Sequence, residues 1–437
     1  MHLPKNRLDL FKYVLVVLVL LILSYNVAIF RIFNFLKYFN AEIKSLSVNK
    51  TEASSSKHLA LNSTTKPVVI EDFSKELSKF KRIIQHNCSP REFKIEREKC
   101  INEILKFDEH LINPNRTNKV LNESEGCDKC FYALNNEKKF VYYHTFWQIH
   151  ETETERFRLI KLNLISYLAT QNLCCTKFIL WKLDEFPQSM HQRLNKTFSY
   201  YIKNGVLELK TFRIGDYCER GFFKRGVCNA THSLNAKYRV SLSDLVRFVV
   251  LDHYGGIYTD GDTIYLKDMR FFWYFNFSYR WTFLNAYNTA VLGIHKHYNS
   301  SLDQFYRVVF AEAATLDDII HSLHPQSMSH TISRLNRNND SIYDYEPLLA
   351  LHSHFFDGAW LCHDGPVRRF TPSSVCQFIE FSTRDLLNGS TFDPSEFYRG
   401  AFAYHIHYKV DVPVSNSYFR LFEEYFQSYV TNLDLNE

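Results

Sequence analysis

The chain has 437 residues, a length that fits one large domain or two ordinary ones. Hydrophobic residues make up 46% and charged residues 23%, a globular balance that excludes an intrinsically disordered chain. The net charge of +5 is spread along the sequence and forms no basic stripe, so the composition gives no support to a nucleic-acid-binding protein.

The first predicted element is a membrane span. YVLVVLVLLILSYNVAIF, at 13–30, has 18 residues and no charge, which is close to the ~20 residues that a helix needs to cross a bilayer. Three basic residues precede it: Lys5, Arg7 and Lys12. A cleaved signal peptide would begin in a similar way, but no A-x-A cleavage site follows the run. We therefore expect a cytoplasmic tail at 1–12, an uncleaved transmembrane signal anchor at 13–30, and the remaining residues in a lumen.

Two further features favour a lumenal location. Eleven N-x-S/T triplets can accept N-linked glycans, at Asn49, Asn62, Asn87, Asn115, Asn122, Asn195, Asn229, Asn276, Asn299, Asn339 and Asn388. Ten cysteines, an even number, suit an oxidising compartment. Spacing alone does not fix the disulfides, but four pairs are plausible: Cys88–Cys100, Cys127–Cys130, Cys218–Cys228 and Cys362–Cys376. The C-x-x-C spacing at 127–130 also fits zinc or redox chemistry, although a single such pair favours a structural disulfide.

Residues 31–138 are typical of a stem that lifts a domain off a membrane. The stretch 40–66 is polar, rich in Ser, Thr, Lys and Asn, and has no sustained period. Residues 71–112 then show helix-like apolar spacing. Five of the eleven glycosylation triplets fall within the predicted stem, which fits an exposed spacer.

The pattern changes at residue 139. Apolar or alternating runs predict three strands, at 138–147, 177–183 and 205–212. Helical spacing predicts a helix in each gap between them, at 155–172 and 186–203. Strands that alternate with helices indicate an α/β domain with a mostly parallel sheet, which we place at 139–437. The sequence contains neither an internal repeat nor a G-x-G-x-x-G or P-loop phosphate motif.

The most informative stretch runs from 244 to 270 and reads DLVRFVVLDHYGGIYTDGDTIYLKDMR. Ser241 stands three residues before its first aspartate, a capping-box spacing that predicts a helix from about Leu242. Gly255 and Gly256 end this helix, and we expect one of them in the left-handed conformation that glycine adopts most easily. Apolar residues at helical spacing supply the buried face of the helix.

A short strand then leads to two carboxylates. Residues 257–259 are β-prone, and Asp260 and Asp262 follow them, where the carboxyl end of a strand places a ligand site in open α/β sheets. Two aspartates at i and i+2 of an extended segment would point to the same side, with Gly261 letting the backbone approach closely. Hard cations such as Mg²⁺ or Mn²⁺ prefer oxygen ligands and neutralise a diphosphate. A charged turn without a metal is the alternative.

The run SDLVRFVVLDHYGGIYTDGD resembles the signature of the D-x-D sugar transferases of glycosyltransferase family 32. The dense similarity covers about 30 residues, with fainter similarity over roughly 140–410. The resemblance implies a GT-A type, Rossmann-like α/β domain that binds a nucleotide-sugar. It also implies a Mn²⁺ (or Mg²⁺) cofactor and transfer with retention of anomeric configuration. For an anchored chain it further implies the Golgi membrane.

The resemblance also implies roles for individual residues. Asp244 and Arg247 match residues that hold the donor sugar, and a surface ion pair between helix neighbours, with a capping role, is the alternative. Asp260 and Asp262 match the D-x-D that holds the metal and the donor. Tyr258, on the strand before them, is counted with the donor-binding residues.

Three later segments are included in the predicted site. The residues HTFW at 144–147 resemble the family's opening strand beside the nucleotide, with core packing as the alternative. Asn288 takes the place of a family asparagine near the donor, or is an ordinary turn residue. His405 matches the histidine of an H-x-W motif and is expected to reach the metal or the diphosphate, while His407 replaces the tryptophan. HPQSMSHTISR, from residue 324, departs from the family's Gly-Pro pair.

The predicted function is therefore a metal-dependent retaining glycosyltransferase. It would move a hexose or N-acetylhexosamine from a nucleotide-sugar, a UDP-sugar being favoured, to a glycan, glycolipid or glycoprotein acceptor. No residue is recognisable as a covalent nucleophile, and the resemblance favours a front-face route in which the departing phosphate helps to deprotonate the acceptor. The alternative is a catalytically inactive lumenal sugar-binding or scaffold relative. The sequence leaves the donor, the acceptor, the linkage and the oligomeric state open.

Overall fold

The computed structural model describes residues 78–88, 90–108, 140–147, 154–217, 239–281, 286–294, 349–358, 397–407 and 417–434. All of them lie within one compact unit, residues 67–437. The predicted signal anchor at 13–30 and the polar stretch at 40–66 lie outside the described residues. Within the described ranges, no helix combines the length and the apolar character that crossing a membrane requires.

A seven-stranded sheet with the order β3-β2-β1-β4-β7-β6-β8 forms the centre of the described structure. Its strands are β1 (Val141–Phe146), β2 (Thr176–Lys182), β3 (Leu207–Thr211), β4 (Gly256–Thr259), β6 (Phe277–Trp281), β7 (Ala286–Ile294) and β8 (Leu349–His352). Strand β7 is antiparallel to both of its neighbours, and every other pairing in this sheet is parallel. The predicted α/β class with a mostly parallel sheet is confirmed, and so are the three predicted strands.

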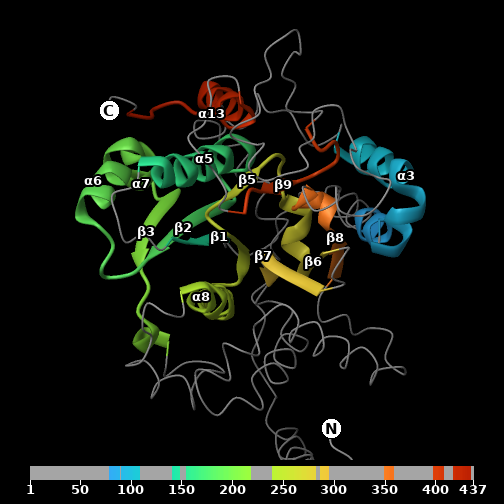
Figure 1. Ribbon diagram of the computed structural model, residues 1–437, viewed down its shortest axis with the longest axis horizontal. Coiled ribbons are helices and arrows are strands. Elements are labelled where there is room, and N and C mark those ends of the chain that lie inside the picture. Colours follow the sequence, from blue (N-terminus) through green and yellow to red (C-terminus); the bar gives the residue numbers. More distant parts are fainter. Residues whose placement is uncertain are drawn as a thin grey trace, which may run out of the picture. The chain divides into compact units, whose positions relative to one another are not determined.

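Helices lie on both faces of this sheet (Figure 1). Helix α5 (Thr154–Thr170), predicted at 155–172, covers one face, and α8 (Arg239–Tyr254) covers the other. The single helix predicted at 186–203 is instead two, α6 (Gln188–Thr197) and α7 (Ser199–Lys203). They are separate because Phe198, whose side chain is fully buried, leaves helical geometry with a φ of −109°.

The remaining elements are short or lie near the ends of the described chain. They are α3 (Pro90–Asp108), α13 (Tyr418–Tyr429), β5 (Thr263–Tyr265), β9 (Ala403–His405), and the short helices η1 (Ile83–Asn87), η3 (Ile214–Tyr217), η7 (Arg270–Tyr274) and η8 (Ser353–Phe355). Helix α13 packs beside α5, where Lys161 Nζ lies 3.3 Å from Glu423 Oε1 in a largely buried ion pair. Strands β5 and β9 pair antiparallel in a small second sheet.

Alternation along the central strands divides the core into two layers. Tyr143, Phe178 and Ile257, which are neighbours in register across β1, β2 and β4, belong to the apolar cluster that includes α5. One position further along the same strands, Ile179 and Tyr258 belong to the cluster formed with α8. Side chains on a strand point to opposite faces in turn, so each strand contributes to both layers. The strands at the sheet centre are therefore fixed from both sides.

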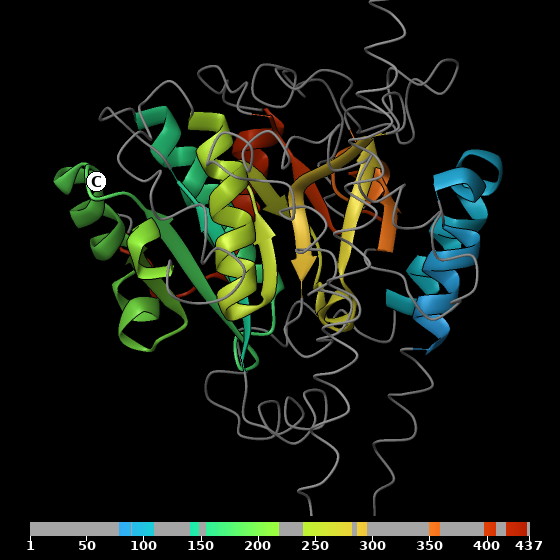
Figure 2. The same ribbon diagram turned by 90° about the horizontal axis from the view of Figure 1, so that it is seen from below.

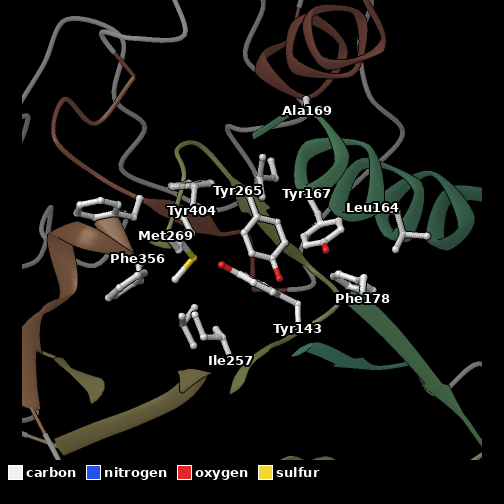
Figure 3. Close-up of a cluster of buried hydrophobic side chains, with 14 of the residues drawn as sticks. Tyr143, Leu164, Tyr167, Ala169, Phe178, Ile257, Tyr265, Met269, Phe356 and Tyr404 are labelled. Carbon is white, nitrogen blue, oxygen red and sulfur yellow. The ribbon is translucent and has the colours of Figure 1, made fainter. Parts of the chain in front are cut away.

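Tyrosine rings from β1, α5 and β5 pack together in the core (Figure 3). The ring centroids of Tyr143 and Tyr167 lie 5.2 Å apart, and each lies 5.8 Å from that of Tyr265. The Tyr143 hydroxyl donates to Gln171 Oε1 and accepts from Trp273 Nε1, both at 2.9 Å. Buried hydroxyls require such partners, so the Tyr143 hydroxyl has its hydrogen bonds made within a close-packed part of the core.

Part of the predicted stem packs against the α/β domain. Helix α3 lies next to β8 (Figure 2). Phe80, 1% exposed, stacks on Phe271 with ring centroids 4.7 Å apart and meets Phe402 edge-on at 6.4 Å. A Cβ added at Gly400 would lie 3.3 Å from Ile101, so α3 also contacts the segment before β9. We expect an exposed spacer over 31–138, and within it the apolar side chains of Phe80 and Ile101 are instead buried. The boundary at 138 lies outside the described residues and stays a prediction.

One of the predicted disulfides is confirmed. Cys88 and Cys100 are bonded, and both side chains are fully buried. The other three predicted pairs lie outside the described residues. Cys174 and Cys175, for which the spacing suggested no pair, each also take part in a disulfide bond.

We expect replacement of Cys88 and Cys100 together by alanine to lower the free energy of unfolding by about 2–3 kcal/mol, because the bond closes a short loop in the unfolded chain. Urea unfolding followed by tryptophan fluorescence measures the change. Arg213→Ala, which removes an exposed ion pair with Asp184, serves as the control and should leave the urea midpoint unchanged. A double variant that unfolds at the wild-type midpoint would contradict the expectation.

Candidate active site

Helix α8 begins earlier than the sequence predicted. It starts at Arg239, so Ser241 lies inside the helix and the predicted capping box is wrong. A capping box uses Glu or Gln three residues after the cap, and Asp244 has a shorter side chain. Its carboxylate instead meets Arg247 on the next turn, with Oδ1 3.0 Å from the guanidinium Nη2. The apolar face of the helix is as predicted, because its residues join the second core cluster.

Two glycines connect α8 to β4. Gly255 has a φ of +69° and Gly256 a φ of +104°. The sequence predicts a left-handed conformation at one of them, and both have a positive φ. A Cβ at Gly256 would lie 2.0 Å from the carbonyl oxygen of Tyr142 on β1. Only glycine allows β4 to approach β1 this closely, and the approach determines where β4 delivers the residues that follow it.

The acidic pair lies in a tight turn. Thr263 N–H donates to the Asp260 carbonyl at 3.0 Å, which closes a turn over Gly261 and Asp262. The expected extended conformation of this segment is therefore wrong: β4 ends at Thr259, and the chain must reverse to form β5. A Cβ at Gly261 would meet its neighbours only at 3.4 Å or beyond, so the protein itself imposes no steric need for glycine there.

Strand β9 brings a histidine to this turn. His405 pairs in register with Thr263 of β5, and Ile406 N–H donates to the Asp262 carbonyl at 2.9 Å. The preceding residue, Tyr404, points into the core (Figure 3). Because side chains alternate along a strand, His405 points the other way, toward the two aspartates.

Asp260, Asp262 and His405 converge into a cluster that fits a metal ion. Their ligand atoms all lie within 4.8 Å of one another, with His405 Nε2 3.2 Å from Asp262 Oδ1 and 3.8 Å from Asp260 Oδ2. Asp262 Oδ1 is buried and has no hydrogen-bond partner within the described part of the chain. His405 Nε2 faces this oxygen as an ion-pair partner without hydrogen-bond geometry, and a divalent cation bound between them would satisfy the oxygen. Two carboxylates and one imidazole are suitable ligands for Mn²⁺.

Electrostatics couples the same groups. Burial alone would lower the pKa of His405, but Asp262 and Asp357 outweigh it and raise that pKa well above its usual value. Burial alone would likewise raise the pKa of Asp262, and His405 outweighs it, so that pKa is lowered. A protonated His405 thus neutralises the carboxylates in the metal-free cluster, and a cation would take over that role.

Arg247 connects α8 to the acidic turn. Its Nη2 lies 3.0 Å from Asp244 Oδ1 and 3.2 Å from Asp260 Oδ1, and its Nη1 donates to Thr289. The guanidinium stands over the fully buried Tyr258 ring at 5.2 Å. The predicted ion pair with Asp244 exists, but it is mostly buried and not on the surface. Contact of Asp244, Arg247 and Tyr258 with a donor stays a prediction.

Asn288 lies in strand β7, so the turn interpretation is wrong. Its Oδ1 accepts from Ala290 N–H at 2.7 Å, and the Ala290 carbonyl in turn accepts from Asp260 N–H at 2.8 Å. The carbonyl of Asn288 also accepts from Ser278. Asn288 therefore shapes the strand segment that holds the backbone of Asp260, and its contact with a donor stays a prediction.

The HTFW segment is core. His144 Nδ1 accepts from Trp181 Nε1 at 3.1 Å, and its Nε2 lies 2.9 Å from the Gly255 carbonyl, so Nε2 carries the proton. Burial lowers the pKa of His144 to about 3. Trp147 is buried against Phe186, with ring centroids 5.6 Å apart. These contacts support the core-packing alternative. The HPQSMSHTISR segment lies outside the described residues.

Sequence reasoning missed Asp357 and Tyr279 and left the role of His407 in doubt. Asp357, which follows η8, is fully buried, and its Oδ1 lies 2.7 Å from His407 Nε2. Its Oδ2 accepts from the Tyr279 hydroxyl at 2.9 Å. Asp357 forms a second group of potential ligands with His405 and His407. No signal in the sequence marks Asp357, because it is a lone aspartate in an unpatterned segment.

In open α/β sheets ligands bind beyond the carboxyl ends of the strands, and the acidic turn of this chain lies in such a place. Residues 186–285 match the family model described as "Glycosyltransferase sugar-binding region containing DXD motif". The match shows that this part of the chain is similar to a glycosyltransferase DXD region, and the narrower resemblance to family 32 stays a prediction. The structure is similar to the chain described as "PaToxG Glycosyltransferase", at 15% identity and a TM-score of 0.33, over 50% of this chain and 78% of that one. Among curated proteins there was no match.

Proposed function

We propose that this chain is a metal-dependent retaining glycosyltransferase of the GT-A type. It moves a hexose or N-acetylhexosamine from a nucleotide-sugar, with a UDP-sugar favoured, to a glycan, glycolipid or glycoprotein acceptor. One observation carries the proposal: His405 joins Asp260 and Asp262 around a buried carboxylate oxygen that has no hydrogen-bond partner among the described residues. The match to the glycosyltransferase model ends at residue 285, so the convergence of His405 is independent support for it.

Under this proposal the described residues bind either the cation or the donor. Asp260, Asp262 and His405 hold the divalent cation, which neutralises and orients the departing diphosphate. Asp244, Tyr258 and Thr289 fix the Arg247 guanidinium beside the same turn. There it contacts the donor. Asp244 contacts the donor sugar. Since these groups are held by buried contacts, they are positioned before the donor arrives.

The acceptor hydroxyl loses its proton to the departing phosphate in the front-face route that we favour. Asp357 is not offered as a nucleophile, because it is fully buried and both of its oxygens are engaged. Under this route the product keeps the anomeric configuration of the donor. Proton NMR of the first-formed product distinguishes retention from inversion.

The experiment that tests this function is a donor panel. The purified full-length chain is incubated with UDP-galactose, UDP-glucose, UDP-N-acetylhexosamines and GDP-mannose, each with Mn²⁺, Mg²⁺ or EDTA. We expect one donor to be hydrolysed slowly with metal, no hydrolysis with EDTA, and recovery when Mn²⁺ is restored. If calorimetry finds that neither cation promotes binding of any UDP or GDP compound, the proposal fails.

The alternative, an inactive lumenal sugar-binding or scaffold protein, predicts a different outcome. Such a protein would bind a sugar without turnover and would not depend on both Asp260 and Asp262. We also propose that the chain is a single-pass type II protein of the Golgi membrane. The apolar run at 13–30, the eleven glycosylation triplets and the buried disulfide between Cys88 and Cys100 support that location.

A further inference from the structure

The two nitrogens of His405 face different carboxylates. Nε2 lies 3.2 Å from Asp262 Oδ1, on the side of the acidic turn. Nδ1 lies 3.4 Å from the Tyr279 hydroxyl and 3.7 Å from Asp357 Oδ2. A histidine binds a metal through a ring nitrogen that carries no proton, and the partner of the other nitrogen decides which one that is. The surroundings of Nδ1 therefore control whether Nε2 is available.

Asp357 is built into the fold behind this ring. Its side chain is fully buried, and its backbone N–H donates to the Ser353 carbonyl at 2.6 Å. The Tyr279 hydroxyl donates to Asp357 Oδ2, which leaves the hydroxyl oxygen and Oδ2 as the acceptors nearest to Nδ1 of His405. Both acceptors favour a proton on Nδ1, so that Nε2 is the nitrogen that gives up its proton when a cation binds.

His407 contacts the other carboxylate oxygen of Asp357. Its Nε2 lies 2.7 Å from Asp357 Oδ1, and its ring centroid lies only 3.8 Å from that of His405. Residues two apart on a regular strand do not bring their rings so close, but His407 has a φ of +61°, which turns its ring back onto that of His405. One carboxylate thus restrains two adjacent imidazoles.

We propose that Asp357 is a positioning residue for His405. It holds the His405 ring with Nε2 aimed at the metal of the acidic turn, while His407 holds the other carboxylate oxygen of Asp357. The inference rests on the proposed function only through the metal site, because it requires a bound cation but no sugar transfer. The same three residues can also be considered as a metal site of their own. Both oxygens of Asp357 already have partners, Tyr279 and His407, which favours the positioning role.

The test measures Mn²⁺ binding in the absence of any nucleotide. Paramagnetic resonance of free Mn²⁺ gives the affinity of the full-length chain, and pulsed resonance of bound Mn²⁺ detects a directly coordinated nitrogen. We expect one Mn²⁺ per wild-type chain with a nitrogen coupling that disappears in His405→Ala. Asp357→Asn should weaken Mn²⁺ binding about tenfold or more and diminish the nitrogen coupling, as changes behind a metal-bound histidine commonly do.

The matched control is Glu423→Gln. Glu423 is another buried carboxylate with two cationic partners, at 3.3 Å from Lys161 and 3.0 Å from Arg420, but it lies on α13. This variant should lose stability without any change in Mn²⁺ affinity or nitrogen coupling. If Asp357→Asn fails to fold, Tyr279→Phe keeps the carboxylate and removes its hydroxyl donor. It should weaken Mn²⁺ binding several-fold.

Several results would overturn the inference. They are wild-type Mn²⁺ affinity and coupling in Asp357→Asn, no Mn²⁺ bound by the wild-type chain, and a nitrogen coupling that survives in His405→Ala. Two ions per wild-type chain, one of which is lost in Asp357→Asn, would also overturn it by making Asp357 a ligand. If the expected Mn²⁺ results are obtained but no nucleotide-sugar is consumed, the proposed function fails and the positioning role stands.

Discussion

Asp262→Ala is expected to lower the metal-dependent turnover of the nucleotide-sugar by about a thousandfold, because the variant loses a metal ligand worth several kcal/mol of transition-state stabilisation. Asp262→Asn should give nearly the same loss with the shape of the side chain retained. Steady-state rates across a Mn²⁺ titration measure both effects. The folded state should persist, because the backbone hydrogen bonds of this turn, from Thr263 N–H to the Asp260 carbonyl and from Ile406 N–H to the Asp262 carbonyl, do not use the Asp262 side chain.

The control for this prediction is Asp184→Ala. Asp184 is an exposed carboxylate with an arginine partner, Arg213, at 2.7 Å, and it belongs to the same domain. Its removal should leave turnover and metal dependence unchanged. Thermal unfolding and near-ultraviolet circular dichroism establish that the Asp262 variants are folded. Wild-type turnover in folded Asp262→Ala would contradict the metal assignment.

The second large effect is expected at the connection between α8 and β4. Gly256→Ala should lower the free energy of unfolding by at least about 3 kcal/mol, because φ is +104° there and the new Cβ would lie 2.0 Å from the Tyr142 carbonyl oxygen. Strand β4 could accommodate the methyl group only by moving away from β1, and Asp260 follows at its end. Urea unfolding and Mn²⁺ affinity measure the two consequences.

Gly205→Ala is the matched control for this substitution. Gly205 also has a positive φ, +68°, but nothing lies within 4 Å of its added Cβ. The control therefore isolates the conformational cost, about 1 kcal/mol, from the steric clash. Equal losses of stability in the two variants would show that the approach of β4 to β1 is not what requires glycine at 256.

The parts of the fold that could be predicted from the sequence are those determined by neighbouring residues. The apolar run at 138–147 and the helical period at 155–172 predicted β1 and α5, because burial of an element constrains its own sequence directly. The double glycine likewise indicated a turn that few other residues can form. The start of α8 was wrong because Ser241 and Asp244 had a cap spacing but not its chemistry.

The site depended on contacts that local patterns do not contain. His405 was included because of a family resemblance, and its distance of 3.2 Å from Asp262 results from the pairing of β9 with β5. Asp357 had neither a pattern nor a resemblance to mark it. Its role depends on Tyr279 and His407, which come from other parts of the chain. Such a residue can be recognised only after the fold has brought its partners together.

The packing of Phe80 and Ile101 has a practical consequence for recombinant work. A truncated product that begins at residue 139 would lack both side chains, and the aromatic faces of Phe271 and Phe402 would then be exposed to water. Such a product would tend to precipitate, and an inactive preparation could be mistaken for an inactive protein. Expression of a fragment that lacks the predicted anchor at 13–30 should therefore begin upstream of residue 78.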